Sequence, residues 1–347
     1  MKGLHFLLIV LLSISFSAAQ TFDDFINQLN STPENERQAL VDSFMNSVSQ
    51  FPYLEQDTLC HFIYQGNANS VTVPGDANNW DPNASPMTHI GGTNFWYRTD
   101  VFESDARLDY KFVLNGSNWI LDPLNPHTIL GGFGPNSELR MPDYVMPPEI
   151  DYYPNIPHGS FLDTTFYSTH LGNSRTIRVY LPPGYYSTSD SFAVLVVHDG
   201  LEYITLANSD NVLDYLIDQN LIEPVIGVFV PPVNRNEEYI GNLQDEFTAF
   251  ITDELIPWVD GRFRAKADPH YRATMGSSAG GNISLWLGLT HPEVFGNVAA
   301  QSSYIQSSIF DGFQNGPTLD LQIYMNLGTY DLPIIIQLVQ SFIPILQ

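Results

Sequence analysis

Short apolar runs, separated by apolar positions at helical spacing, occupy the second half of the chain. Residues 192–197 and 225–230 are almost continuously apolar, as expected of strands buried on both faces of a parallel sheet. Between and after them, residues such as Phe247, Ile251 and Leu255 recur at the spacing of one helical face. Alternating strands and helices predict an α/β fold over residues 161–347, with helices on both faces of the sheet.

Between residues 56 and 145 the apolar positions alternate instead. Leu108, Tyr110 and Phe112 alternate with charged residues, and Asn115-Gly116 is a signal for a tight hairpin turn. Several short strands of this kind predict an all-β sandwich, which has the size of one small domain.

Glycine and proline mark the end of this β segment. Residues 122–126 and the glycines within residues 131–134 are interpreted as exit loops of the sandwich. The proline-rich residues 146–160 are interpreted as a linker, which places the domain boundary near residue 150.

Residues 20–55 are predicted to form a helical hairpin. Phe22, Phe25 and Leu29 are spaced for one helical face, and the segment Thr32-Pro33-Glu34 has the features of a second helix start. Packing on a neighbouring domain is the favoured role, and a short interaction surface is the alternative.

The first 19 residues have the order of a secretory signal peptide. Lys2 precedes an apolar run, and small residues follow up to Ala19. An uncleaved anchor is the alternative, but the run is shorter than the ~20 residues that a spanning helix needs. We therefore expect a secreted or periplasmic chain with no membrane span in its mature form.

Charge and composition exclude several functions. Thirteen Lys and Arg stand against 38 Asp and Glu, a formal net charge of −25, so a nucleic-acid partner is not expected. Cys60 is the only cysteine, which excludes an intramolecular disulfide. Because metal-ligand spacings and phosphate loops are missing from the sequence, no metal and no cofactor are expected.

A candidate nucleophile lies in the segment 271–282. Gly276-x-Ser278-x-Gly280 fits the nucleophile elbow, in which a strand turns sharply into a helix and presents a serine hydroxyl. An ordinary small-residue turn gives the same short pattern. The flanking residues favour the elbow, because a strand-like run precedes Ser278 and helix-spaced apolar residues follow it.

The wider segment, about residues 165 to 335, resembles the enterochelin-esterase and feruloyl-esterase-like family of α/β-hydrolases. Beside the Ser278 motif, the similarity includes Arg235-Asn-Glu-Glu-Tyr239, Asp253-Glu-Leu-Ile-Pro257, His291-Pro-Glu-Val-Phe295 and Ala300-Gln-Ser302. The resemblance implies an α/β-hydrolase fold and a serine esterase that acts on carboxylic esters.

The resemblance also assigns roles around Ser278. The backbone N–H groups of Ala279 and Leu201 are expected to stabilise the oxyanion. Asp331 matches the acid that orients the catalytic histidine, although a helix cap is the alternative for this residue. His198 and Asp199 are interpreted as residues that hold the oxyanion loop.

The β segment resembles the immunoglobulin-like glycogen-binding module of branching enzymes. The matching residues lie in Gly75-Asp-Ala-Asn-Asn-Trp80-Asp-Pro, Tyr110-Lys111-Phe112 and Asn115-Gly-Ser-Asn-Trp119. By this resemblance Trp80, Lys111 and Trp119 would contact glycan, since an indole can cover a sugar face. Packing beside a catalytic domain is the alternative role of these tryptophans.

The expected catalytic histidine is missing from this sequence. It should follow Asp331 after one more helix and strand, but the last histidine is His291. The sequence therefore predicts an α/β-hydrolase domain that is truncated at its C-terminus. Two functions remain open: a secreted serine esterase for carbohydrate-linked or siderophore-type esters, and a non-catalytic glycan-binding protein on a hydrolase scaffold.

Overall fold

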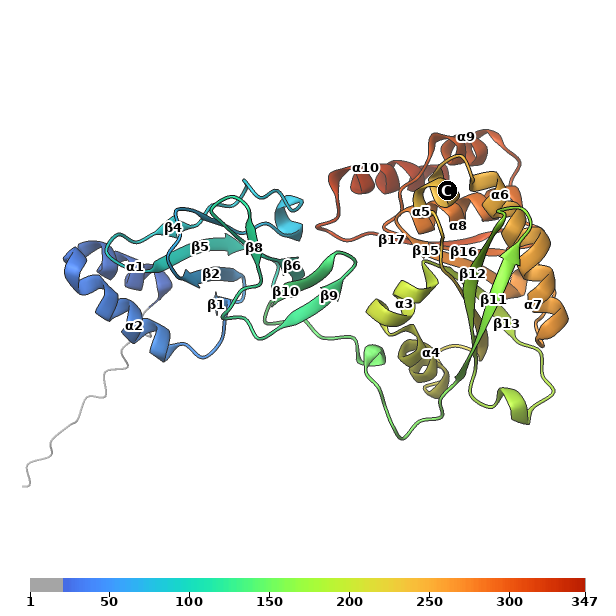
Figure 1. The fold of residues 1–347 in the computed structure, drawn as a ribbon, viewed down its shortest axis with the longest axis horizontal. Coiled ribbons are helices and arrows are strands. Elements are labelled where there is room, and N and C mark those ends of the chain that lie inside the picture. Colours follow the sequence, from blue (N-terminus) through green and yellow to red (C-terminus); the bar gives the residue numbers. More distant parts are fainter. Residues whose placement is uncertain (1–20, 347) are drawn as a thin grey trace, which may run out of the picture.

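The structure is a computed structural model that describes residues 21–346. The expected signal peptide lies outside the described residues. Two lobes follow one another along the chain, a mostly β N-terminal lobe and an α/β C-terminal lobe (Figure 1). Within the described part of the chain, no helix is long and apolar enough to cross a membrane.

The C-terminal lobe is built on a seven-stranded mixed sheet with the order β11-β12-β14-β13-β15-β16-β17. The strands are β11 (Ser160–Ser168), β12 (Asn173–Leu181), β13 (Ala193–His198), β14 (Val225–Val230), β15 (Arg272–Ser277), β16 (Asn297–Gln301) and β17 (Gln322–Asn326). β11, β12 and β14 pair antiparallel, and all pairs from β14 to β17 are parallel. The predicted α/β fold is confirmed.

Helices cover both faces of this sheet. They are α3 (Gly200–Ala207), α4 (Ser209–Asp218), α5 (Arg235–Ile240), α6 (Gln244–Ala249), α7 (Ile256–Arg262), α8 (Ala279–Thr290), α9 (Ser307–Asn315) and α10 (Pro333–Phe342), with a π-helical turn, Phe250–Leu255, between α6 and α7. On β13, Val194 and Val196 pack against the α6 to α8 side, whereas Leu195 and Val197 pack toward α3 and α4. Alternate residues of one strand are therefore buried on opposite faces, which explains the continuous apolar run.

The N-terminal lobe contains three small antiparallel sheets. Their strands are β1 (Tyr53–Glu55), β2 (Leu59–Gln65), β3 (Val71–Thr72), β4 (Thr88–His89), β5 (Phe95–Val101), β6 (Arg107–Tyr110), β7 (Phe112–Leu114), β8 (Asn118–Ile120), β9 (Thr128–Gly131) and β10 (Gly134–Arg140). The sheet orders are β1-β2-β5-β4, β6-β10-β9 and β3-β7-β8. All three contribute to one core that includes Phe62, Tyr110 and Phe112.

Two turns of this lobe differ in how well the sequence predicts them. Asn115 and Gly116 both have positive φ in the three-residue turn, residues 115–117, that joins β7 to β8 as a hairpin. The interpretation of residues 131–134 as exit loops is wrong, because they form the tip of the β9–β10 hairpin. β10 continues across the core through Leu139, so this hairpin is part of the lobe's framework.

Helices α1 (Phe22–Ser31) and α2 (Arg37–Ser47) pack on the β2–β5 side of the lobe. Phe22, Phe25 and Leu29 are buried against Ile63 and Phe95. The second helix starts later than predicted, because Glu34–Glu36 forms a 3₁₀ turn before α2.

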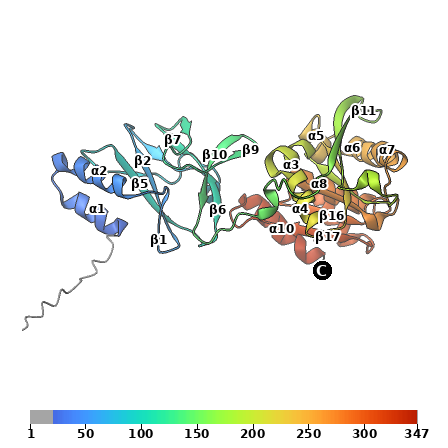
Figure 2. The same ribbon diagram turned by 90° about the horizontal axis from the view of Figure 1, so that it is seen from below.

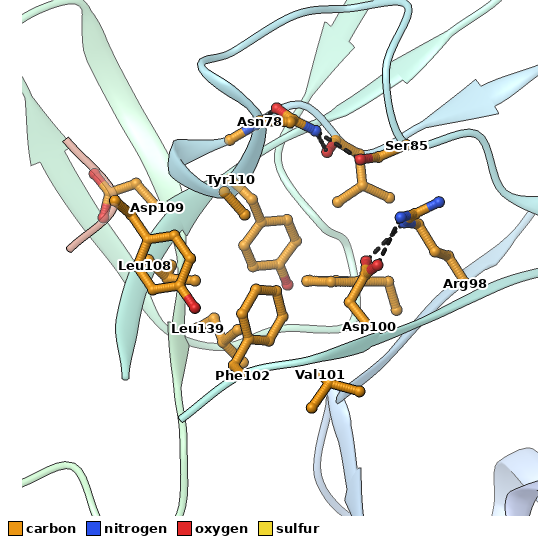
Figure 3. Close-up of a pocket in the computed structure, with 15 residues that line it drawn as sticks. Asn78, Ser85, Arg98, Asp100, Val101, Phe102, Leu108, Asp109, Tyr110 and Leu139 are labelled. Atoms are coloured by element: carbon orange, nitrogen blue, oxygen red, sulfur yellow. Dashed lines mark hydrogen bonds and ion pairs between the residues drawn. The ribbon is translucent and has the colours of Figure 1, made fainter. Parts of the chain in front are cut away.

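The lobes meet through the loop between β17 and α10, which both views place beside the N-terminal lobe (Figures 1 and 2). The hydroxyl of Tyr330 donates to Glu103 Oε2 at 2.5 Å, and its ring lies edge-on to Phe102 with 6.1 Å between centroids. Tyr330 also lines a cavity of about 240 Å³ inside the N-terminal lobe, near the ion pair of Arg98 and Asp100 (Figure 3). The Tyr330 ring is thus inserted between residues of the other lobe.

Candidate functional site

Ser278 occupies the sharp turn between β15 and α8. Its backbone has φ 57° and ψ −118°, an unusual conformation for a residue with a side chain. Neighbouring backbone groups hold it there: Ser278 N–H donates to Gln301 O at 2.9 Å, and Ser278 O accepts from Asn282 and Tyr304. The Ser278 side chain is half-buried. A strained serine between a strand and a helix is the geometry of a nucleophile elbow.

Glycines allow the close approaches around this turn. A Cβ on Gly276 would lie 2.5 Å from the carbonyl carbon of Gly280, so β15 and α8 approach at backbone distance. A Cβ on Gly281 would lie 2.7 Å from Ser303 Oγ. The small residues around Ser278 are therefore required by packing.

We expect Gly281→Ala to destabilise the C-terminal lobe by about 1–3 kcal/mol, because the added methyl group overpacks against Ser303. Gly261→Ala in α7 is the control, since its Cβ would meet no atom within 4 Å and alanine favours the helix. Urea denaturation of both variants measures the difference. Equal stability of the two variants would contradict the packing role.

Two backbone donors lie at the same edge of the sheet as Ser278. Ala279 is the first residue of α8, and Leu201 is the second residue of α3. N–H groups in the first turn of a helix have no partner within that helix. Because β13 and β15 are adjacent parallel strands, the two helices begin side by side at the carboxyl edge.

An ion pair that sequence reasoning missed fixes this edge. Arg235 donates from Nε and Nη2 to the two carboxylate oxygens of Asp199, at 2.7 and 2.8 Å. Arg235 Nη2 also donates to the backbone oxygen of Ser277 at 3.2 Å, and Tyr239 Oη accepts from Asp199 N–H. The segment 235–239 thus connects the turn before α3 to the residue before Ser278. This segment is one of those that carry the resemblance to the esterase family, and that resemblance was the signal in the sequence that could have identified the ion pair.

Behind this network lies a fully buried ion pair. Arg175 Nη1 on β12 donates to Glu238 Oε2 at 2.8 Å, and the side chains are 1% and 0% exposed. Glu238 also accepts from the backbone N–H groups of Val233 and Asn234. The pair therefore anchors the start of α5, which carries Arg235.

His198 is the last residue of β13, the strand adjacent to β15, which leads to Ser278. Its side chain is fully buried, and Nε2 lies 2.9 Å from Thr274 Oγ1. Burial lowers the pKa of His198 to about 3, so the imidazole is neutral at pH 7. His198 is therefore a buried strand residue, and the turn into α3 begins after it.

Because His198 is buried, the free energy of unfolding should depend on pH in the acidic range. Its pKa is lower in the folded protein than the unfolded value near 6.5, so stability is full above pH 6.5 and falls as the pH drops toward 3. The slope for this residue is up to about 1.4 kcal/mol per pH unit. We expect His198→Gln to flatten the pH dependence of urea denaturation between about pH 3 and 7.

Asp331 lies in the loop after β17, two strands from β15. Because β15, β16 and β17 are parallel, this loop and Ser278 share one edge of the sheet. The carboxylate accepts from the backbone N–H groups of Gly328 at 3.3 Å and Leu332 at 3.2 Å. Within residues 21–346, no histidine hydrogen-bonds to Ser278 or Asp331.

Trp80, Lys111 and Trp119 line one cavity of about 640 Å³. Trp80 Nε1 donates to Asp76 Oδ1 at 2.9 Å, which fixes the indole, while Trp119 is 42% exposed. Tyr330, Asp331 and Leu332 of the C-terminal lobe line the same cavity. Among the described residues, no group of three or more His, Cys, Asp or Glu could hold a metal ion.

Comparisons with known proteins identify the C-terminal lobe. Residues 168–335 match the Esterase family model. The uncharacterized protein YjcH of Bacillus subtilis is 28% identical over 178 residues, 50% of this chain and 74% of that protein. The endo-1,4-beta-xylanase/feruloyl esterase of Xylanibacter ruminicola is 30% identical over 174 residues, 46% of this chain but only 24% of that protein.

A solved structure extends the similarity of fold across both lobes. The enterobactin esterase FES from Shigella flexneri aligns with a TM-score of 0.72 and 21% identity, covering 88% of this chain and 89% of that protein. At this identity the alignment establishes the fold alone. Residues 168–335 are thus similar to the Esterase family, and these comparisons support a carboxylic ester hydrolase with an α/β fold.

Proposed function

We propose that the chain is a secreted serine esterase with Ser278 as its nucleophile. The observation that supports this most directly is the strained backbone of Ser278 at the strand-to-helix turn. The Ser278 oxygen would attack the ester carbonyl carbon, and its proton would pass through water to the alkoxide, which would leave as the alcohol. A second water molecule would then hydrolyse the acyl-serine, releasing the acid and returning the proton to Ser278. The N–H groups of Leu201 and Ala279 would donate to the oxyanion.

Asp331 is proposed as the orienting acid of this site. Its place at the carboxyl edge, in the loop after the second strand beyond β15, agrees with the chain order of serine before acid in α/β-hydrolases. The Asp199–Arg235 pair would keep the oxyanion loop in place, since it ties this loop to the residue before Ser278.

The substrate is proposed to be a carbohydrate-linked ester, with a siderophore-type ester as the alternative. The name of the Xylanibacter relative pairs feruloyl esterase with xylanase activity, and that of the Shigella protein names enterobactin. The N-terminal lobe, proposed to be an immunoglobulin-like module over residues 56–145, would bind glycan through Trp80, Lys111 and Trp119. A polysaccharide partner follows from this assignment.

The test is covalent labelling with a fluorophosphonate followed by peptide mass spectrometry. We expect slow labelling at Ser278 in the unmodified chain, because no histidine within residues 21–346 hydrogen-bonds to it, and no label at this position in Ser278→Ala. A label on another serine would remove Ser278 from the mechanism. The complete lack of any label, together with saturable glycan binding, would favour the non-catalytic alternative.

A further inference from the structure

The cavity of about 640 Å³ is formed by both lobes. Trp80, Lys111 and Trp119 come from the N-terminal lobe, and Tyr330 and Leu332 come from the loop after β17. Its volume is within the range of about 300–1,000 Å³ that is typical of small-molecule sites. A ligand in this cavity would touch the loop that carries Asp331.

The lining suits a ring with hydroxyl groups. Trp119 and Leu332 are 42% and 49% exposed, so their apolar surfaces are available to a ligand. Within the described residues, Lys111 Nζ has no ion-pair partner, so its three N–H groups are available to hydroxyl oxygens. Asn136 adds a side-chain amide whose Nδ2 is held by Asp109 at 2.9 Å.

The charges of the lining select against anions. One cation, Lys111, stands against the carboxylates of Asp76, Asp109 and Asp331. The whole chain carries a formal charge of −25, which adds to the repulsion of an anionic ligand. The cavity should therefore prefer a neutral polyhydroxylated ligand to an acidic one.

Contacts between the lobes keep the cavity assembled. Tyr330 is fixed to Glu103 and Phe102, and it lies directly before Asp331 and Leu332. Asn211 of α4 donates to the backbone oxygen of Ile150, which ties the linker to the C-terminal lobe. The two walls of the cavity thus have a defined spacing.

We propose that this cavity is a two-lobe subsite that holds the sugar part of a neutral carbohydrate ester. This inference rests on the proposed esterase function and extends it, because the catalytic lobe contributes Leu332 and Tyr330 to sugar recognition. Binding of glycan by the N-terminal lobe alone would need neither residue.

Calorimetric titration of the full-length chain with maltoheptaose and xylohexaose tests the proposal. At least one neutral oligosaccharide should bind, and hexagalacturonate should bind about tenfold more weakly or worse. Trp119→Ala should weaken binding of the neutral sugar by about tenfold. Leu332→Ala should weaken it by about fivefold, since an apolar contact of the second wall is lost.

Ile334→Ala is the matched control for Leu332. Ile334 is 51% exposed in the same region of the chain but lies outside the cavity lining, so its replacement should leave the affinity unchanged. An unchanged affinity of Leu332→Ala would confine the site to the N-terminal lobe and overturn the proposal. Failure of both neutral sugars to bind, or equal binding of hexagalacturonate, would also overturn it.

The same titration in Ser278→Ala separates this inference from the proposed function. The cavity lining does not include Ser278, so sugar affinity should be unchanged in that variant. Intact binding without labelling at Ser278 would leave the subsite and reject the nucleophile. Labelling at Ser278 without sugar binding would support the nucleophile and reject the subsite.

Discussion

Replacing Ser278 with alanine should lower the rate of p-nitrophenyl acetate hydrolysis by about tenfold, because the reaction loses the atom that forms the acyl-enzyme. The expected loss is smaller than in a complete triad, since no histidine within residues 21–346 hydrogen-bonds to Ser278. The variant should fold normally, since the hydrogen bonds that hold the elbow are made by the backbone of Ser278. Initial rates at saturating ester, together with a circular dichroism melt, check both expectations.

Ser277→Ala is the control for this variant. Ser277 is the last residue of β15, and its backbone oxygen accepts from Arg235 whichever side chain it carries. Its replacement should leave the hydrolysis rate within about twofold of the unmodified chain. Equal rates in Ser278→Ala and Ser277→Ala would show that hydrolysis does not use Ser278.

Glu238→Ala should destabilise the C-terminal lobe by about 3–5 kcal/mol, because it leaves the charge of Arg175 buried without its partner. Loss of this anchor should also loosen α5 and with it Arg235. Hydrogen exchange of the amides in β12 and β14 would report the loss of stability within this lobe.

The matched control is Arg178→Ala on the same strand. Arg178 pairs with Asp163 at 2.7 Å, but these side chains are 33% and 47% exposed to solvent. Removal of this pair should cost about 1 kcal/mol or less. A cost for Glu238→Ala as small as that for Arg178→Ala would show that the buried pair is not an anchor.

The sequence predicted the α/β lobe well because its strands are buried on both faces. Most residues of 193–198 and 225–230 are buried and apolar, so the composition of each segment predicts a central strand. The Ser278 turn was predictable for a related reason. Gly276 and Gly280 approach at backbone distance, and only glycine satisfies that constraint.

The sequence predicted long-range polar contacts poorly. Arg235 and Asp199 are 36 positions apart, and Arg175 and Glu238 are 63 apart, so neither pair gives a local pattern. The β9–β10 hairpin was interpreted as loop because glycines occupy its tip and Pro135 lies within its second strand. Tyr330 gave no signal either, since its contacts belong to the other lobe.

The insertion of Tyr330 between residues of the N-terminal lobe limits which N-terminal lobes can be combined with this C-terminal lobe during evolution. The Tyr330 hydroxyl and ring are matched to Glu103 and Phe102, and the next residue is Asp331. A foreign β domain joined at the linker would lack the matching pair, so the loop before α10 would lose its support. Exchange of the N-terminal lobe for that of another protein should therefore preserve the loop before α10 only when residues 328–332 are exchanged together with the lobe.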